Sequence, residues 1–327
     1  MQLHIAFTRG LIAAACIALA AISSSTFAQG NYPNKAIKLV VSVGAGGATD
    51  TLARKLAEKL AVALGQPVVV ENQPAASGVI AAQTVARAAP DGYTILIGTN
   101  TTHAGNQAFL KSVPYDPISD FEPITRLGLA ALLLGINNDV PAKSVMELTA
   151  YAKANPGKLA FGAGTGSARL ATEMYKAIER IDLLSVPYKG NQAAMTDLRG
   201  GRIHILFGDI ALMQTQVKAG AVRGLAVSSA KRSAAVPEFP TMQEAGVPGY
   251  ELVGWIAAFA PAKTPASIVK RLNEEMNKAL ADKDFVASLH ALGVDAAPGT
   301  PEQLRDWVKA ETKKWGDLAR NAGIEPE

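Results

Sequence analysis

Two short glycine-rich segments contain residue types suited to binding an anion. Residues 44–50 (GAGGATD) and residues 162–167 (GAGTGS) each follow an apolar run and precede an amphipathic stretch, so each predicts a turn between a strand and a helix. Such a turn presents backbone N–H groups at a helix N-terminus, where negative charge is favoured. Ser167 is predicted to cap the second helix, and Asp50 lies near the start of the first. Two such turns facing one cleft predict a carboxylate site that needs no arginine.

The first turn has two other interpretations. Its glycines are equally consistent with a tight turn alone, with Asp50 acting only as a helix cap. A dinucleotide site is the second interpretation, because Glu71 ends the next predicted strand at the distance where an acidic residue would bind a ribose. The spacing argues against it, because the third glycine of that motif would fall on Thr49.

Further polar residues follow strands predicted later in the chain. Tyr188 and Asn191 come after one predicted strand, and Asp209 comes after the next. We expect these three side chains to line the cleft at strand ends. Asp209 is equally consistent with a turn or helix cap, and Lys189 is expected to be a solvated loop charge.

Residues that could carry catalysis or hold a metal are sparse. His103, His204 and His290 lie far apart without the H-x-x-x-H spacing of a metal site, and no G-x-S-x-G segment presents a serine. We therefore expect no catalytic residue, no metal and no cofactor. An exported hydrolase or isomerase that uses Asp50 or Asp209 with His103, which follows a strand end, is the less favoured alternative.

The elements that must position these residues alternate along the chain. Short Val/Ile/Leu-rich runs alternate with amphipathic stretches, which predicts βαβ units around parallel sheets. The predicted strands are 37–43, 68–71, 93–98, 158–161, 184–186, 205–207 and 225–227, and the predicted helices are 50–64, 79–88, 144–154, 167–178 and 191–199. The tail from Pro265 is predicted to be mainly helical, with Thr300 capping the last helix and Pro301 at its first position.

Two blocks of βαβ units predict an α/β protein with two doubly wound lobes. The apolar runs 127–136 and 253–260 each precede a polar or proline-marked break, so we expect both to cross between the lobes. The first lobe would then be discontinuous, comprising residues 29–127 and 256–327, and residues 128–255 would form the second.

The N-terminal segment has the pattern of a secretory signal peptide. Arg9 precedes an apolar stretch at 11–22, and Thr26 and Ala28 supply the small side chains expected before a cleavage site. Cleavage after Ala28 would remove Cys16, the only cysteine, and leave 299 of the 327 residues. We therefore expect a periplasmic protein without disulfides, thiol chemistry or a cysteine metal site.

Composition narrows the class of protein further. Apolar residues make up 49% of the chain and charged residues 18%, which argues against disorder. The formal net charge of +4 is spread along the chain, so it predicts no nucleic-acid surface and mildly favours anionic small molecules.

Several motifs resemble those of one protein family. In chain order they are Tyr32-Pro33 before the strand at 37, residues 45–50, Pro90-Asp91-Gly92-Tyr93, Tyr115-Asp116, and residues 164–167, 186–190 and 261–265. They span nearly the whole chain after the signal segment and resemble the Bug, or TctC-like, extracytoplasmic solute-binding proteins. The resemblance implies a type II periplasmic-binding-protein fold, or Venus flytrap, with two crossing strands and two lobes that close on a small organic anion.

The resemblance also implies ligands and partners. Proteins of this kind capture di- or tricarboxylates, acidic amino acids or aromatic acids for the membrane subunits of a tripartite tricarboxylate transporter. Their two glycine turns grip a carboxylate, partly through ordered water. We expect a monomer that binds no nucleic acid, and a ligand sensor that docks to a membrane signalling partner is the alternative. The predicted ligand-binding residues are Val43, Gly44, Ala45, Gly46, Gly47, Asp50, Asn100, Ala163, Gly164, Thr165, Gly166, Ser167, Tyr188, Gly190, Asn191 and Asp209.

The chain departs from the family pattern near both turns. Ser42 and Val43 replace a common Pro-Phe pair, which removes an aromatic wall. Ala163 stands where a serine is common, and Arg169 stands where a histidine is common. The resemblance therefore leaves the class of carboxylate open.

Overall fold

The computed structural model describes residues 32–188 and 190–326. The predicted signal peptide (1–28), its cleavage site after Ala28 and the loop residue Lys189 lie outside the described residues. The chain divides into two units, Met1–Lys35 and Ala36–Glu327, and the architecture below is that of the second unit.

The strands of the first lobe form a sheet in the order β2-β1-β3-β9-β4. β1 (Ile37–Val41) lies between β2 (Val68–Asn72) and β3 (Thr94–Thr99) and is parallel to both. β9 (Val253–Pro261) runs antiparallel to β3. Four of the five side chains of β1 are apolar and buried, as expected for a parallel strand covered on both faces.

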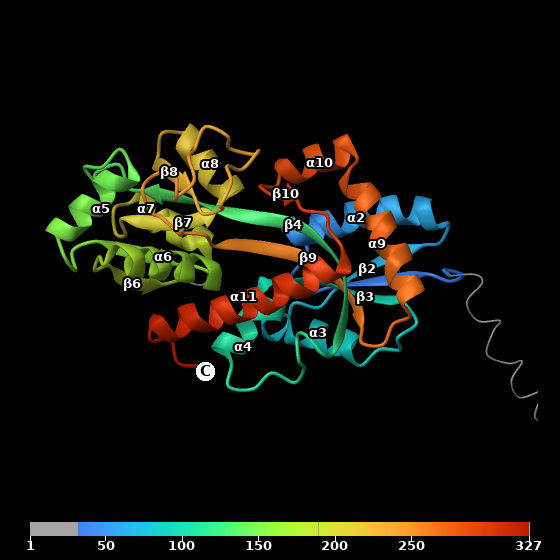
Figure 1. Ribbon diagram of the computed structural model, residues 1–327. Helices are drawn as coiled ribbons and strands as arrows, with labels where there is room; N and C mark the ends of the chain where they lie inside the picture. Colours follow the sequence, from blue (N-terminus) through green and yellow to red (C-terminus); the bar gives the residue numbers. More distant parts are fainter. Residues whose placement is uncertain (1–31, 189, 327) are drawn as a thin grey trace, which may run out of the picture. The chain divides into compact units, whose positions relative to one another are not determined.

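One long strand belongs to both sheets. β4 (Phe121–Ile136) pairs antiparallel with β9 as far as Ala131, and from Leu132 onward it pairs with β7 (Ile205–Asp209). The second sheet is completed by β8 (Arg223–Val227), which pairs with β4, and by β5 (Ala160–Ala163) and β6 (Leu184–Pro187). Figure 1 shows β4 passing from one lobe into the other.

The observed architecture confirms the predicted α/β fold of two lobes joined by crossing strands. The apolar runs 127–136 and 253–260 fall within β4 and β9, respectively. The predicted lobe boundaries, residues 29–127 with 256–327 and residues 128–255, cut through these two strands and stay predictions.

The helices follow the predicted alternation. In the first lobe they are α2 (Ala48–Leu64), α3 (Val79–Ala86), α4 (Asn106–Phe109), α9 (Ala266–Leu280), α10 (Lys283–His290) and α11 (Pro301–Asn321), and in the second α5 (Val145–Ala154), α6 (Gly166–Glu179), α7 (Asn191–Arg199) and α8 (Ile210–Lys218). Each strand and helix predicted by range within the described residues is present, with ends shifted by a few residues. Among the described helices, none has the length and apolar character required to cross a bilayer.

Some short elements were not predicted from the sequence. They are the two-residue strand β10 (Asp295–Ala296), the 3-10 turn Ala76–Gly78, the π-helix Thr101–Gly105 and the single turn α4. Segments this short contain too few residues to show hydrophobic periodicity. Helix α8, which has nine residues, was also not predicted.

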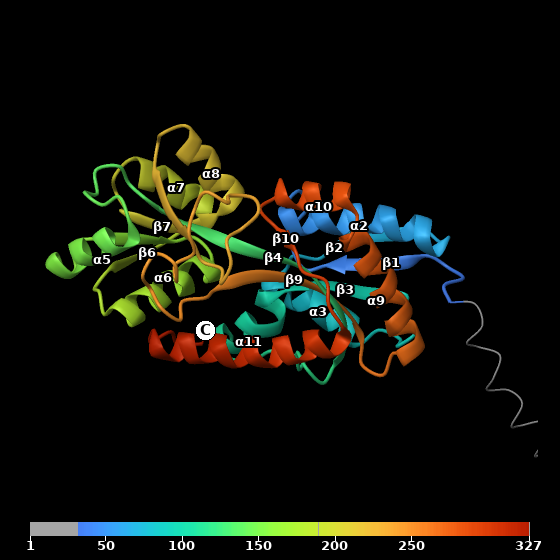
Figure 2. The ribbon, with the colours of Figure 1, turned by 45° about the horizontal axis from the view of Figure 1, so that its top comes forward.

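Helices cover both faces of the first sheet. Figure 2 shows α2 and α10 on one side of β1 and β3, and α3 and α11 on the other. Val40 of β1 and Leu96 of β3 share a core with Val85 of α3 and with Leu304 and Val308 of α11. The sheet is therefore the middle layer of a three-layer lobe.

Helix α11 packs against both lobes. Its residues Leu304 and Val308 belong to the core of the first lobe, whereas Trp315 belongs to the core of the second. Between them, the carboxylate of Glu311 is 3% exposed and accepts hydrogen bonds from the indole Nε1 of Trp255 on β9 (3.3 Å) and of Trp315 (3.1 Å). A buried carboxylate is tolerated only where donors satisfy it, so Glu311 links α11 to the crossing strand.

We expect Glu311→Ala to lower the free energy of unfolding by about 2–4 kcal/mol, because it leaves two buried indole N–H groups without an acceptor. Chemical denaturation at pH 7 measures the change. Lys309→Ala, at an exposed position of the same helix, is the control and should stay within about 0.5 kcal/mol of the parent protein. Equal stability of the two variants would contradict a structural role for Glu311.

Candidate functional site

A cleft of about 880 Å³ lies where β4 passes from the first sheet to the second. The first lobe contributes the turn after β1, the N-terminus of α2 and the end of β3. The second lobe contributes the N-termini of α6 and α8. This volume falls in the range of pockets that hold small molecules, about 300–1,000 Å³.

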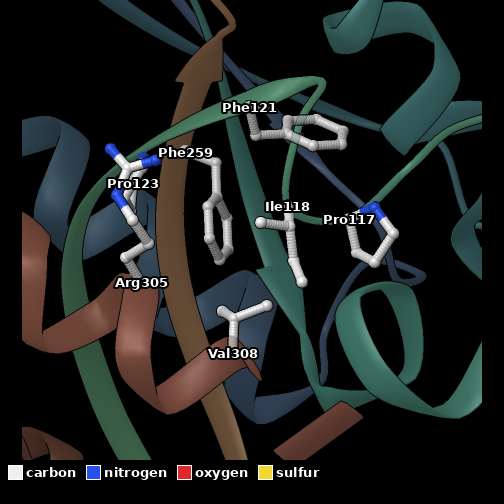
Figure 3. A pocket seen from close by; sticks show the side chains of 7 residues that line it. All are labelled: Pro117, Ile118, Phe121, Pro123, Phe259, Arg305 and Val308. Atoms are coloured by element: carbon white, nitrogen blue, oxygen red, sulfur yellow. The ribbon is translucent and has the colours of Figure 1, made fainter. Parts of the chain in front are cut away.

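A second pocket, shown in Figure 3, is too small to be a ligand site. It has a volume of about 10 Å³, and Phe121, Phe259 and Val308 are among the side chains around it. A cavity of this size holds about one water molecule at most. The pocket therefore belongs to the packing between β9, α11 and the segment that leads into β4.

The turn between β1 and α2 presents unused backbone donors to the cleft. Gly47 is the N-cap of α2 and makes no side-chain cap. The amides of Ala48 and Thr49 have no hydrogen-bond acceptor among the described residues, and all three residues line the cleft. Gly46 adopts a φ of +87°, in the left-handed region that favours glycine. The turn therefore offers free N–H groups at the positive end of the α2 dipole.

The carboxylate of Asp50 holds this turn in place. Asp50 is 2% exposed and accepts hydrogen bonds from the Gly46 amide (2.8 Å), Arg54 Nε (3.0 Å) and Asn72 Nδ2 (2.9 Å). Burial raises the pKa of Asp50, but these hydrogen bonds and the charge of Arg54 outweigh burial and hold the pKa below its ordinary value of 3.8. Asp50 is therefore an ionised support for the turn, and it does not line the cleft.

The N-terminus of α6 repeats the arrangement on the second lobe. The predicted cap, Ser167, is wrong: Thr165 is the N-cap, and its hydroxyl accepts from the amide of Ala168 at 3.1 Å. The amides of Gly166 and Ser167 have no acceptor within the described part of the chain. The hydroxyl of Ser167 accepts instead from Asn100 Nδ2 of the first lobe at 3.3 Å, so the two lobes make a polar contact at the cleft.

Gly164 is required by a close approach of α7. A Cβ atom at this position would lie 2.5 Å from Asn191 Oδ1 and 2.7 Å from the Asn191 amide nitrogen. Asn191 Nδ2 in turn donates to Asp209 Oδ2 at 2.9 Å. The glycine turn before α6, the start of α7 and the end of β7 are therefore packed together.

The structure brings half of the predicted site residues to the cleft. Those that line it are Val43, Gly44, Gly46, Gly47, Asn100, Thr165, Ser167 and Asp209. Those that do not are Ala45, Asp50, Ala163, Gly164, Gly166, Tyr188, Gly190 and Asn191. Tyr188 donates its hydroxyl to Asp197 at 2.8 Å, away from the ligand cleft, and burial and Asp197 raise its pKa to about 12.

Sequence reasoning missed three other parts of the cleft wall. They are the first two turns of α8, the residues of β4 and β9 around the strand crossing, and the loop after α10. Their lining residues are Ile210, Ala211, Leu212, Thr215, Gln216, Ala130, Ala131, Leu132, Gly254, Trp255, Ile256, Ala291, Leu292, Gly293 and Val294. Most are apolar and carry no recognisable motif. Their contribution follows from the crossing of β4, which only the tertiary fold reveals. Five residues beside predicted ones were missed as well, namely Ala48, Thr49, Thr99, Thr101 and Gln192.

His103 does not line the cleft, so it is not placed to act there with Asp50 or Asp209, as the less favoured enzyme alternative requires. It is completely buried, its ring stacks on Phe259 at 3.8 Å between centroids, and its Nδ1 lies 2.9 Å from Thr102 Oγ1. Burial lowers the pKa of His103 to about 3. Over the described residues, no group of three or more His, Cys, Asp or Glu side chains is placed to hold a metal ion.

The positions that depart from the family pattern differ in their roles. Ser42 is buried, and its hydroxyl donates to the carbonyl of Ile97 at 3.2 Å, so only Val43 faces the cleft. Arg169 lines a separate pocket of about 460 Å³ together with Lys111 and residues 323–326. Arg169 therefore contributes no charge to the cleft wall.

Comparisons with known proteins point to one family. A family model described as "Tripartite tricarboxylate transporter family receptor" matches residues 52–324. Protein BugT of Bordetella pertussis is 34% identical over 310 residues, which cover 94% of this chain and 95% of BugT.

Solved structures give the same result. The structure "R. palustris Rpa4515 with adipate" is 36% identical, with a TM-score of 0.78 over 90% of this chain and all of that one. MatC (Rpa3494) from Rhodopseudomonas palustris with bound malate is 31% identical, with a TM-score of 0.71 over 88% of this chain and 99% of MatC.

We expect Asp50→Asn to lower the free energy of unfolding by about 1.5–3 kcal/mol at pH 7, because an amide cannot accept from all three donors. A carboxyl whose pKa is depressed in the folded state stabilises the protein above pH 3.8, and this stabilisation is lost as the pH falls through the folded pKa. The difference between the parent protein and the variant should therefore shrink below about pH 4.

Urea denaturation at pH 7, 5 and 3 measures this dependence. Asp306→Asn, at an exposed position of α11, is the control and should change stability little at any of the three pH values. A destabilisation by Asp50→Asn that is as large at pH 3 as at pH 7 would mean that the charge is not its cause.

Proposed function

Because the chain belongs to the tripartite tricarboxylate transporter receptor family, we propose that it captures a small organic carboxylate between its two lobes and delivers it to membrane transporter subunits. Two similar proteins of solved structure hold carboxylates, adipate in one and malate in the other. Both structures support a dicarboxylate-sized ligand for this cleft.

The observation that carries the proposal is the pair of helix N-termini that face one cleft from opposite lobes. The amides of Ala48 and Thr49 on α2, and of Gly166 and Ser167 on α6, have no acceptor among the described residues. A carboxylate oxygen supplies the acceptor that such amides lack, and the helix dipoles favour its charge. None of the described residues that line the cleft is Lys, Arg or His, so backbone donors are the proposed anion ligands.

Because the amides lie on two lobes, ligand binding favours a form in which the lobes are closer together. Amides on one lobe reach only one side of a ligand, so a ligand gains both sets of hydrogen bonds only when the lobes approach. A ligand shifts the equilibrium toward the closed form by its differential affinity for that form. The contact between Asn100 and Ser167 marks where the lobes already meet.

Capture rather than turnover is the function that the site supports. The alternative of a hydrolase or isomerase needed His103 beside Asp50 or Asp209, but His103 is buried against Phe259 and does not line the cleft. Periplasmic localisation is part of the proposal and is supported by the similar periplasmic binding protein BugD, 34% identical with a TM-score of 0.73. The cleavage site after Ala28 and the transporter partner are likewise proposed.

Substitutions at Gly47 test the role of the α2 amides. Gly47 has an extended backbone and open space where a Cβ would lie, so side chains fit there. The ligand to use is whichever of succinate, L-malate, L-aspartate and adipate binds the parent protein most tightly. We expect its affinity to decrease from Gly47→Ala to Gly47→Asn and to be lowest for Gly47→Asp. Asn at the N-cap takes up an amide of the first turn, and Asp also adds a negative charge, so Gly47→Asp should bind at least about 10-fold more weakly than the parent protein.

Isothermal titration calorimetry measures these affinities, and a thermal shift without ligand is the control for folding. Asp and Asn are both favoured N-caps, so neither variant should be less stable than the parent protein. Equal affinity of all four proteins would contradict binding at the α2 N-terminus. Failure of every carboxylate to stabilise the parent protein would contradict the proposed function itself.

A further inference from the structure

Asp209 is the only charged side chain among the described residues that line the cleft. It is exposed and lies at the end of β7, directly before α8. Its side chain makes no cap hydrogen bond with α8, and its one hydrogen bond is accepted from Asn191 Nδ2 through Oδ2. The other oxygen, Oδ1, has no donor within the described part of the chain.

The hydrogen bond from Asn191 determines which oxygen atoms beside Asp209 remain free to accept a hydrogen bond from a ligand. An ionised carboxylate only accepts hydrogen bonds, so Asn191 must turn its Nδ2 toward Asp209 and its Oδ1 away. Asn191 is 5% exposed, and its Oδ1 is a buried acceptor without a donor. Two oxygen atoms at this place therefore lack a hydrogen-bond donor among the described residues, Asp209 Oδ1 and Asn191 Oδ1. Of the two residues, Asp209 lines the cleft.

The charge at this place does not suit a second ligand carboxylate. The N-terminus of α8 is equivalent to about half a positive elementary charge, so it favours a negative charge nearby. The carboxylate of Asp209 already supplies a full negative charge at this helix end. A ligand carboxylate beside the Asp209 carboxylate would be repelled by its like charge. A ligand ammonium or hydroxyl group would instead donate to the free Oδ1.

We propose that Asp209, oriented by Asn191, is a specificity-determining residue that favours carboxylates bearing an ammonium or hydroxyl donor over matched carboxylates without one. This inference rests on the proposed function, because it concerns the second polar group of a ligand whose carboxylate the helix N-termini bind. It narrows the ligand class from organic acids in general to amino and hydroxy acids.

Two matched series of ligands test the inference, since the donor can lie next to a carboxylate or at the far end of the ligand. The first series is succinate, L-malate and L-aspartate, and the second is adipate, 6-hydroxyhexanoate and 6-aminohexanoate. Calorimetric titration of the parent protein should give a donor-bearing ligand at least about 10-fold tighter binding than the plain dicarboxylate of its series.

Asp209→Asn is the matched variant, because it removes the charge and keeps the size of the side chain. It should reduce the preference for the ammonium ligand by about 10-fold. It should also raise the affinity for succinate or adipate, because the like charge beside their second carboxylate is removed. Asp306→Asn, on α11 and not among the residues that line the cleft, should leave all affinities as in the parent protein.

The outcomes separate this inference from the proposed function. Plain dicarboxylates that bind as tightly as their donor-bearing partners in both series would overturn the inference and support the proposed function. An unchanged preference in Asp209→Asn would also overturn it, because the discrimination would then come from elsewhere. Failure of all six ligands to bind would overturn both.

Discussion

The buried carboxylate of Asp50 is the interaction on which the cleft depends. It gathers three donors from a turn, a helix and a neighbouring strand, and so fixes the path of the chain between β1 and α2. This support has a cost for binding, because the amide of Gly46 is used by Asp50 and is no longer available to a ligand. The free donors are therefore those one step further along, on Ala48 and Thr49, which point from the helix end.

The second constraint is that the two lobes share strands. β4 exchanges its partner between Ala131 and Leu132, so its backbone hydrogen bonds hold both sheets on one strand. Helix α11 adds side-chain packing from both cores, and Glu311 links Trp255 of β9 to Trp315. Trp255 also lines the cleft, so this buried carboxylate contacts a residue of the cleft wall.

Much of this arrangement could be predicted from the sequence, because it depends on local patterns. Alternating apolar runs and amphipathic stretches located the strands and helices, and the glycine-rich segments located the turns that face the cleft. What failed depended on contacts between distant residues. Ser167 and Thr165 both carry hydroxyls two positions apart, so only the backbone shows which of them caps α6. The burial of His103 beneath Phe259 and the apolar wall from α8 have no local signature.

Because few charged side chains line the described part of the cleft, backbone amides and side chains have different roles in the proposed binding. The amides bind the carboxylate, and the side chains provide selectivity. Backbone amides do not titrate and lose no side-chain entropy on binding, so they can hold a carboxylate in the same way over a wide pH range. They also distinguish poorly between one carboxylate and another, since each offers the same oxygens. Selectivity must then come from whichever side chains stand beside the amides. Among the described residues that line the cleft, Asp209 alone is charged, and its sign limits which groups the rest of the ligand can carry.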